Sequence, residues 1–255
     1  MEKNSPIIRV SNLTKVYPEI IALDGISFNV FPGEIFGLLG PNGAGKTTTL
    51  EIIETLRKKT SGEVVVCDFS IDEFPDEIKK RIGVQLQSAN YYPNLSLNQL
   101  LDLFSGLYNK AINKNEILHQ VGLEERGKSK YKELSGGQKQ RFSLATTLIN
   151  EPSIIFLDEP TTGLDPQARR NLWDLIRKIR SDGATVVITT HYMDEAETLC
   201  DRVAIVEKGK IIAIDSPANL IDQLIATGFK REATVKNANL EDVFLSLTGH
   251  ELRDA

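Results

Sequence analysis

The chain has 255 residues, 41% of them hydrophobic and 25% charged, which is ordinary for a globular protein that buries a sizeable core. Its net charge of −5 argues against a broad nucleic-acid footprint or a basic membrane patch, and no run approaches the roughly 18 apolar residues that cross a bilayer. The start, MEKNSPIIRV, lacks a secretory signal, and Cys67 and Cys200 have no metal-ligand spacing, so we expect a cytosolic protein with reduced thiols that reaches any membrane through a partner.

Alternating strand signals open the chain. Residues 7–16 and 26–30 alternate apolar and polar positions and are separated by turn residues, which predicts an antiparallel sheet. Residues 64–69 add a further strand signal. Much later, residues 203–214 have the pattern of a hairpin with a Lys-Gly turn.

Three short apolar segments rich in β-branched residues predict buried strands, and each runs into a polar or glycine-bearing turn. Helical periodicity follows them in turn, so strands and helices alternate along the chain. This alternation predicts a parallel sheet with helices on its faces and with ligands at the carboxyl ends of the strands. The strand segments are residues 34–39, 153–157 and 184–189, and the helical segments are residues 46–58, 166–181 and 193–199.

The strand signal disappears between residues 88 and 133, where the sequence has the pattern of two or three amphipathic helices. We expect this stretch to be a helical insertion on the α/β core. Residues 240–249 predict a short capped helix packed back on the body. The whole chain, residues 1–255, is expected to form a single domain.

The motif GPNGAGKT follows the first buried segment and precedes a helix, which is the context expected of a phosphate-binding loop. Gly43 and Gly45 allow backbone N–H groups to approach phosphates, Lys46 supplies charge to the β- and γ-phosphates, and the Thr47 hydroxyl suits Mg²⁺. A glycine-rich turn without a ligand is the alternative. We therefore expect the α/β fold of a P-loop NTPase, with a mostly parallel sheet, an antiparallel N-terminal β subdomain and the helical insertion. The predicted nucleotide-binding residues of this loop are Gly40, Pro41, Asn42, Gly43, Ala44, Gly45, Lys46, Thr47 and Thr48.

The segment IIFLDE ends a predicted buried strand with two carboxylates. Asp158 suits a direct or indirect Mg²⁺ contact, and Glu159 suits either a general base or a residue that orients the attacking water. A strand end capped by acidic residues is the alternative, and it becomes less attractive beside a phosphate-binding loop.

A second glycine-bearing motif, LSGGQKQR, begins another predicted helix. Ser135 and Gln138 have the spacing of a capping box, which needs no ligand. Gly136 and Gly137 are not explained by that box, because glycine in a helix costs up to about 1 kcal/mol relative to alanine. Close approach of a phosphate to bare backbone N–H groups does explain them.

The ordered set GPNGAGKT, LSGGQ, IIFLDEP, GLD and His191 resembles the nucleotide-binding subunit of an ABC (ATP-binding cassette) transporter over nearly the whole chain. The resemblance implies ATP and Mg²⁺ as cofactors. It also implies that residues 135–138 and Asp165 contribute to the ATP site of the opposite subunit of a dimer. Asp165 could equally be the N-cap of the helix that begins at Pro166, and the two roles are compatible.

Three further residues are carried over by the same resemblance. Tyr17 corresponds to an aromatic that stacks on adenine, although an aromatic at a strand end can be packing alone. Gln87 corresponds to the glutamine that reaches Mg²⁺ and the water and senses the membrane partner; Leu86 stands where the family usually has proline. His191 corresponds to the histidine that contacts the γ-phosphate, against the alternative of a structural histidine.

The stretches PNGAGKTTT, HYMDEAETLCDR and NLEDVFLSLTGHELRD resemble drug, antibiotic or lipid exporters whose permease is a separate chain. This implies a homodimer, or a heterodimer with a similar ATPase, at the cytoplasmic face of the membrane and bound to an integral membrane permease. No nucleic-acid partner is expected. Residues 88–94 correspond to the place where a coupling helix of the permease would dock, or else pack as an ordinary loop.

Other classes of protein fit the sequence less well. A soluble ABC ATPase of DNA repair needs a long coiled coil for which residues 50–133 leave no room, and translation types usually carry two cassettes per chain. A GTP-dependent switch needs an Asn-Lys-x-Asp motif, whereas Asn109-Lys110 is followed by alanine and isoleucine. The soluble ABC ATPase acting in translation or repair remains the alternative.

Overall fold

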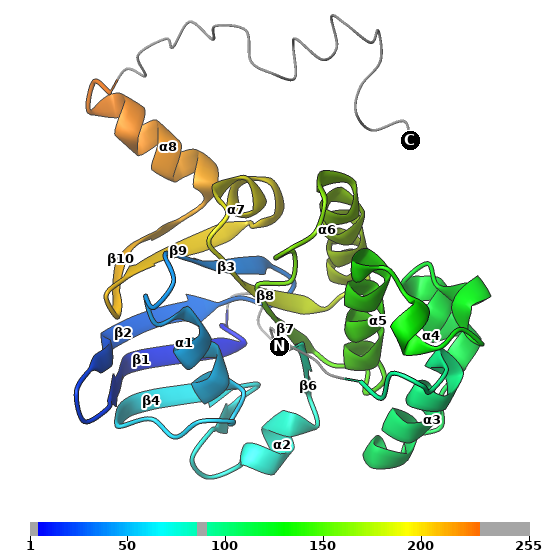
Figure 1. Ribbon diagram of the computed structural model, residues 1–255. Helices are drawn as coiled ribbons and strands as arrows, with labels where there is room; N and C mark the ends of the chain where they lie inside the picture. The colour runs from blue at the N-terminus through cyan, green and yellow to red at the C-terminus, as the bar shows by residue number, and fades with distance from the viewer. Residues whose placement is uncertain (1–4, 86–90, 230–255) are drawn as a thin grey trace, which may run out of the picture. The chain divides into compact units, whose positions relative to one another are not determined.

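The computed structural model describes residues 5–85 and 91–229 (Figure 1). Contacts between residues divide the chain into two units, Met1–Asn219 and Leu220–Ala255. Helix α8 (Pro217–Ala226) crosses the boundary between them, and none of its residues is buried. The predicted helix at 240–249 and Gln87 lie outside the described residues. No helix in the described ranges is both long and apolar enough to span a bilayer.

The N-terminal part of the first unit forms the predicted antiparallel sheet. The strand order is β2-β1-β4-β5, and β1 pairs antiparallel with both β2 and β4. Alternate residues are buried at the start of β1 and the end of β2, as the alternating sequence predicts, and register shifts after Val10 interrupt the alternation. The four strands are β1 (Ile8–Val16), β2 (Ile21–Val30), β4 (Ser61–Val66) and β5 (Phe69–Ser70).

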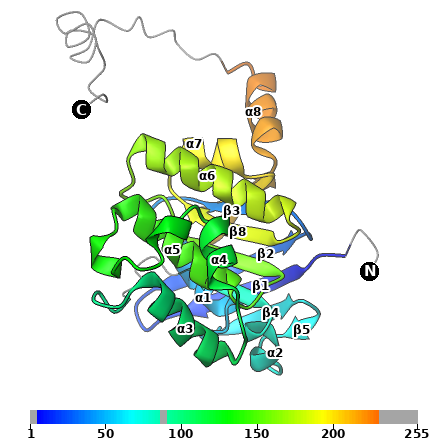
Figure 2. The same ribbon diagram turned by 90° about the vertical axis from the view of Figure 1, so that its right-hand side faces the viewer.

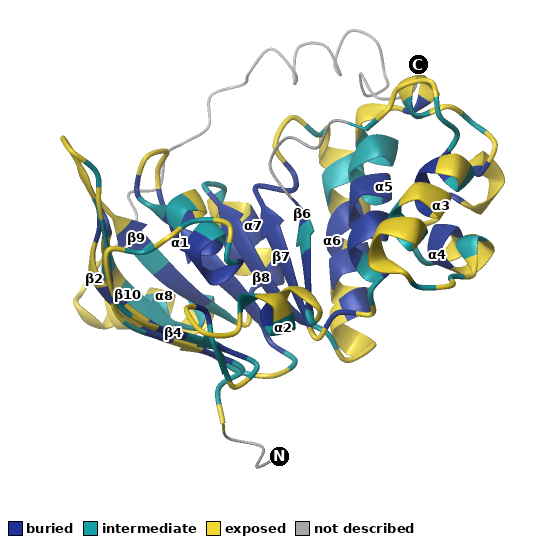
Figure 3. Ribbon diagram, turned by 90° about the horizontal axis from the view of Figure 1, so that it is seen from below, coloured by how far each residue is buried: buried dark blue, intermediate teal, exposed yellow. Residues whose placement is uncertain are grey.

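A second sheet of six strands forms the predicted parallel core, in the order β10-β9-β3-β8-β7-β6. All neighbours are parallel except β9 and β10, which form the hairpin. Strands β3, β7 and β8 are buried along their whole length, which explains their continuous apolar sequences. Figure 3 shows this for β7 and β8. The strands are β3 (Ile35–Leu39), β6 (Ile82–Gln85), β7 (Ile154–Asp158), β8 (Thr185–Thr190), β9 (Arg202–Glu207) and β10 (Lys210–Asp215).

The two sheets share one hydrophobic core with α1 (Lys46–Ile53). Phe28 of the antiparallel sheet stacks on Phe36 of the parallel sheet, with ring centroids 5.4 Å apart. Leu50 of α1 and Phe156 of β7 belong to the same buried cluster. The phosphate-loop helix is therefore fixed to both sheets by apolar contacts, as an α/β layer architecture requires.

Helices α5, α6 and α7 lie against the parallel sheet, α5 beside β6 and α6 and α7 beside β8 (Figure 2). The predicted helical insertion contains α3 and α4, which pack on α5, and two short 3₁₀ turns. The α/β fold class is thus confirmed, with its antiparallel sheet and helical segment. The helices are α2 (Pro75–Lys79), α3 (Leu97–Tyr108), α4 (Lys114–Gln120), α5 (Gly136–Leu148), α6 (Pro166–Ser181) and α7 (Met193–Leu199).

Helix α1 ends at Ile53, five residues before the predicted end at residue 58. The backbone turns at Thr55, whose φ is +64°, and the N–H groups of Leu56 and Arg57 both donate to the carbonyl of Glu51. Two N–H groups that share one carbonyl acceptor, beside a residue in the left-handed conformation, are typical of a helix C-terminus. Threonine rarely adopts a left-handed conformation, so the sequence does not predict that the helix ends here.

Candidate functional site

The phosphate-loop motif connects β3 to α1 and has the backbone that its glycines predict. Gly43 and Gly45 have φ of +79° and +106°. A Cβ atom on Gly40 would lie 2.1 Å from the carbonyl oxygen of Val206, so a side chain there would displace backbone. The loop borders an open pocket of about 290 Å³ lined by Ile20, Ala22, Asn42, Gly43, Gly45, Lys46, Thr47, Thr48 and Glu159.

Lys46 is buried at the base of this pocket. Its Nζ donates to the carbonyl oxygens of Gly40 at 2.8 Å and Pro41 at 3.0 Å, and it lies 3.5 Å from Glu159 Oε1. The ammonium is therefore aimed into the loop, where phosphate oxygens could replace the carbonyls as its acceptors.

Asp158 ends β7 directly beside the loop. Its carboxylate accepts hydrogen bonds from the hydroxyls of Thr47, at 3.1 Å, and Thr189. Burial raises the pKa of Asp158, and the two hydroxyl donors oppose that shift. In residues 5–85 and 91–229, no group of three or more His, Cys, Asp or Glu side chains is arranged so that it could hold a metal ion by itself. A hydroxyl beside one carboxylate suits Mg²⁺, which is usually held by one or two carboxylates together with substrate phosphates.

Glu159 has a left-handed backbone, with φ of +48°, which is uncommon for a residue other than glycine. Its N–H donates to the backbone carbonyl and the hydroxyl of Thr189, which hold this conformation. His191 Nδ1 lies 3.2 Å from Glu159 Oε2, a contact at ion-pair distance without hydrogen-bond alignment. Strained backbone of this kind gathers at functional sites, where the fold can hold it.

Tyr17 lies at the end of the β1–β2 hairpin, and Ile20 across the turn lines the phosphate-loop pocket. Its phenol oxygen accepts a hydrogen bond of 2.7 Å from Arg57. Ile20 and Ala22 as pocket-lining residues, and Arg57, were not predicted from the sequence. No local signal in the sequence marks Ile20, because its exposure and its place beside the phosphate loop follow from the fold.

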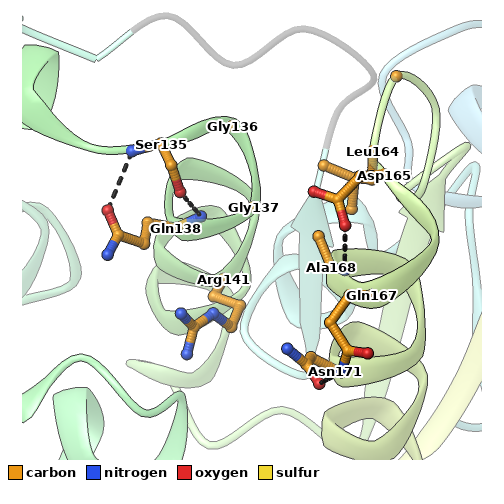
Figure 4. A pocket seen from close by; sticks show the side chains of 11 residues that line it. Ser135, Gly136, Gly137, Gln138, Arg141, Leu164, Asp165, Gln167, Ala168 and Asn171 are labelled. Atoms are coloured by element: carbon orange, nitrogen blue, oxygen red, sulfur yellow. Dashed lines mark hydrogen bonds between the residues drawn. The ribbon is translucent and has the colours of Figure 1, made fainter. Parts of the chain in front are cut away.

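Ser135 and Gln138 form the capping box at the start of α5. The Ser135 hydroxyl accepts from the Gln138 N–H at 3.3 Å, and Gln138 Oε1 accepts from the Ser135 N–H at 2.9 Å (Figure 4). Asp165 caps α6 in the same way, by accepting from the Ala168 N–H at 2.8 Å. Both cap alternatives therefore hold in the structure, whatever else these residues do.

The two capped helix ends face one pocket of about 450 Å³. Arg141, Gln167 and Asn171 also line it, and the sequence reasoning did not identify them. A Cβ on Gly137 would lie 3.0 Å from Ala168 Cβ, so packing against α6 favours glycine there. A Cβ on Gly136 would meet nothing within 4 Å, so packing gives no reason for glycine at that position.

The pocket at residues 135–138, which we call the signature of the chain, shares no lining residue with the phosphate-loop pocket. The structure thus brings Lys46, Thr47, Asp158, Glu159 and His191 together, and places Ser135, Gly136, Gly137, Gln138 and Asp165 at a second surface. Of the possible docking segment, Tyr91 packs on Phe104, Tyr131 and Phe142, whereas Tyr92 is exposed.

Residues 23–162 match the model of the family described as ABC transporter. Curated relatives match along their whole length. The Nod factor export ATP-binding protein I of Cupriavidus metallidurans is 34% identical, with 97% of this chain and 99% of the relative covered. The protein of the same name from Burkholderia lata is 36% identical, with 95% and 97% covered.

Solved structures agree with these relatives. An ATP-binding subunit of an ABC transporter superposes with a TM-score of 0.75 at 26% identity, covering 95% of this chain and 99% of that one. A dimeric ATP-binding cassette in a post-hydrolysis state with ADP and Pi superposes with a TM-score of 0.74 at 31% identity, covering 82% and 98%.

Proposed function

The chain belongs to the ABC transporter family as an ATP-binding, ATP-hydrolysing subunit, and from that membership we propose that it powers export of a small molecule or lipid through a separate membrane permease. The full-length relatives named for Nod factor export support export as the direction. They also favour this function over a soluble ABC ATPase of translation or DNA repair.

The observation that carries the catalytic part is that Glu159, which lines the phosphate-loop pocket, contacts both Lys46 and His191. We propose that Lys46 exchanges its carbonyl acceptors for phosphate oxygens. Glu159 then accepts a proton from the attacking water, and His191 orients Glu159 and contacts the γ-phosphate. Thr47 and Asp158 would hold Mg²⁺, which neutralises charge on the phosphates, and Gln87 is proposed to reach the same ion.

The arrangement of the second pocket supports sharing of the site between two chains. Ser135, Gly136, Gly137, Gln138 and Asp165 are proposed to contact ATP bound by the opposite subunit, in a homodimer or a heterodimer with a similar ATPase. The dimeric relative shows that such cassettes pair. Attachment to the cytoplasmic face of a membrane would then come through the permease.

Replacing Glu159 with glutamine tests the catalytic proposal. Glutamine keeps the shape of the side chain but is a poor base, so we expect ATP binding to remain and hydrolysis to fall about a hundredfold or more. The variant should accumulate as an ATP-bound dimer, measured by size-exclusion chromatography with light scattering. Glu197→Gln, at an exposed position of α7, makes the same chemical change as a control.

Turnover of Glu159→Gln close to that of the wild type would remove Glu159 from the role of base.

Lys46→Ala is expected to lose ATP affinity, measured by titration calorimetry.

Purification of the chain with its bound membrane protein tests the export role. Capture of a ribosome or of DNA instead would favour the alternative class.

A further inference from the structure

The end of the β1–β2 hairpin is attached to the segment that follows α1. The Thr60 N–H donates to the carbonyl of Thr14 at 2.9 Å, and the Val16 N–H donates to the Thr60 hydroxyl at 3.0 Å. Tyr17 comes next in the chain, and its N–H donates to the carbonyl of Ile20 at 2.8 Å. The backbone of Tyr17 is thus placed by the same segment that ends the phosphate-loop helix.

Arg57 extends this attachment to the Tyr17 side chain. Its Nη1 donates to the Tyr17 hydroxyl at 2.7 Å, and its Nε donates to Glu51 Oε2 at 2.5 Å. The Arg57 backbone N–H also donates to the Glu51 carbonyl. Since Glu51 belongs to α1, which begins at Lys46, one planar guanidinium connects the aromatic ring to the helix beneath the phosphate loop.

A second cation completes the surroundings of the ring. Lys15 Nζ lies 4.9 Å from the centroid of Tyr17 and donates to the carbonyl of Lys58 at 2.9 Å. A cation at this distance from an aromatic ring is attracted to its electron-rich face. The Tyr17 ring is therefore held both at its hydroxyl and from its face, although it lies at the exposed end of a hairpin.

We propose that Arg57 is a positioning residue for recognition of the adenine base: by holding the Tyr17 hydroxyl against α1, it fixes the ring in the orientation in which it stacks on the base. The inference rests on the proposed function, because it assumes ATP at the phosphate loop and adenine at Tyr17. A ring that is ordered before binding loses less conformational entropy when the base stacks on it.

The test compares MgATP with inorganic tripolyphosphate, which carries the phosphates without a base, in titration calorimetry on the full chain. Arg57→Leu and Tyr17→Phe, which keeps the ring but removes the hydroxyl, should each weaken ATP binding about three- to tenfold. Neither should change tripolyphosphate binding. The double variant should be no weaker than either single variant, because both remove the same hydrogen bond.

Lys58→Leu is the matched control. It removes one positive charge next to Arg57, but only the backbone carbonyl of Lys58 takes part in the network described above. Affinity for ATP should therefore stay within about twofold of the wild type. Thermal unfolding of each variant shows whether the fold is retained. If Arg57→Leu does not fold, Tyr17→Phe, which removes only one oxygen atom, still tests the hydrogen bond.

Three results would overturn the inference. Equal loss of ATP and tripolyphosphate binding in Arg57→Leu would mean that Arg57 acts by its charge on the phosphates. Additive losses in the double variant would mean that Arg57 acts independently of Tyr17, and unchanged ATP affinity in both variants would mean that the ring needs no such support. Failure of the assumption that ATP binds at the phosphate loop is distinct from these, because the wild-type chain would then bind neither MgATP nor tripolyphosphate.

Discussion

Glu54 is the C-cap of α1 and is buried, at 3% exposed, near the predicted metal-binding carboxylate of Asp158. Burial, with smaller contributions from the charges of Asp158 and Glu51, raises the pKa of Glu54 to about 8. The native state therefore keeps this proton at neutral pH, whereas the unfolded chain releases it near the ordinary value of 4.5. A neutral Glu54 avoids a second buried negative charge beside Asp158.

We expect this proton to make stability depend on pH. Between about pH 4.5 and 8 the native state binds one proton more than the unfolded state, so the free energy of unfolding falls as the pH rises, by at most about 1.4 kcal/mol per pH unit. Glu54→Gln removes the titrating group. The free energy of unfolding of this variant should therefore increase relative to that of the wild type as the pH rises through this window. Urea unfolding at several pH values, with EDTA and without nucleotide, measures the difference.

Glu63→Gln removes a carboxylate from an exposed position and controls for the change in net charge. A difference between the wild type and Glu54→Gln that stays constant from pH 5 to 8 would show that the native state does not retain the proton.

At the scale of elements, the sequence predicted those whose signal is local. The helices at 166–181 and 193–199 were predicted with the bounds that the structure has, because Asp165 caps the first and both have strong local helix signals. Buried strands β3, β7 and β8 were predicted to within one residue. β6 was not predicted as a strand, because its four residues become a strand only by pairing with β7.

Of the candidate site, the motifs could be predicted but their partners could not. Glu54 lies in a stretch, LEIIETL, that gives no hint that this carboxylate is buried, since burial depends on how α1 meets both sheets. The contact of His191 with Glu159 likewise depends on the order of β7 and β8 in the sheet. The local sequence of a strand does not predict which distant strand it pairs with.

The start of α5 separates a structural need for glycine from a functional one. Gly136 has open space where a Cβ would lie and is not among the glycines with positive φ. Gly136→Ala should therefore leave the fold intact and stabilise it by about 0.5–1 kcal/mol. If the proposed contact with ATP of the opposite subunit is made here, the added methyl group obstructs the phosphate, and ATP hydrolysis should fall about tenfold. Chemical denaturation and steady-state ATPase assays measure the two effects.

Gly106→Ala is the control, because Gly106 lies in α3 with equally open surroundings. It should stabilise the chain similarly without changing hydrolysis. Full ATPase activity in Gly136→Ala would indicate that no phosphate approaches the backbone at this position.

For the molecule as a whole, the loop after β7 and helix α6 are joined through Glu195, which is fully buried on α7. Its Oε1 accepts hydrogen bonds from Thr161 at 2.8 Å and from Trp173 at 2.9 Å. Thr161 lies between Glu159 and Asp165 in the chain, and Trp173 belongs to α6, which Asp165 caps. The loop that carries the proposed base and the surface that faces the second pocket are therefore parts of one hydrogen-bonded body.

If each site is shared between chains, two kinds of mixed dimer should differ in activity. In the first, a Lys46→Ala chain pairs with a Gly136→Asp chain, which leaves one intact phosphate loop opposite one intact signature. In the second, a chain with both substitutions pairs with a wild-type chain, which leaves no complete pair.

Two affinity tags isolate each mixed dimer, and ATPase assays compare them with the wild-type dimer at equal concentration. We expect the first to hydrolyse ATP and the second to be nearly inactive, because in the proposed dimer residues 135–138 of each chain meet the phosphate loop of its partner, and the two-fold symmetry forms this pair twice. A site contained in one chain predicts the opposite order, since only the wild-type chain of the second dimer would then be whole.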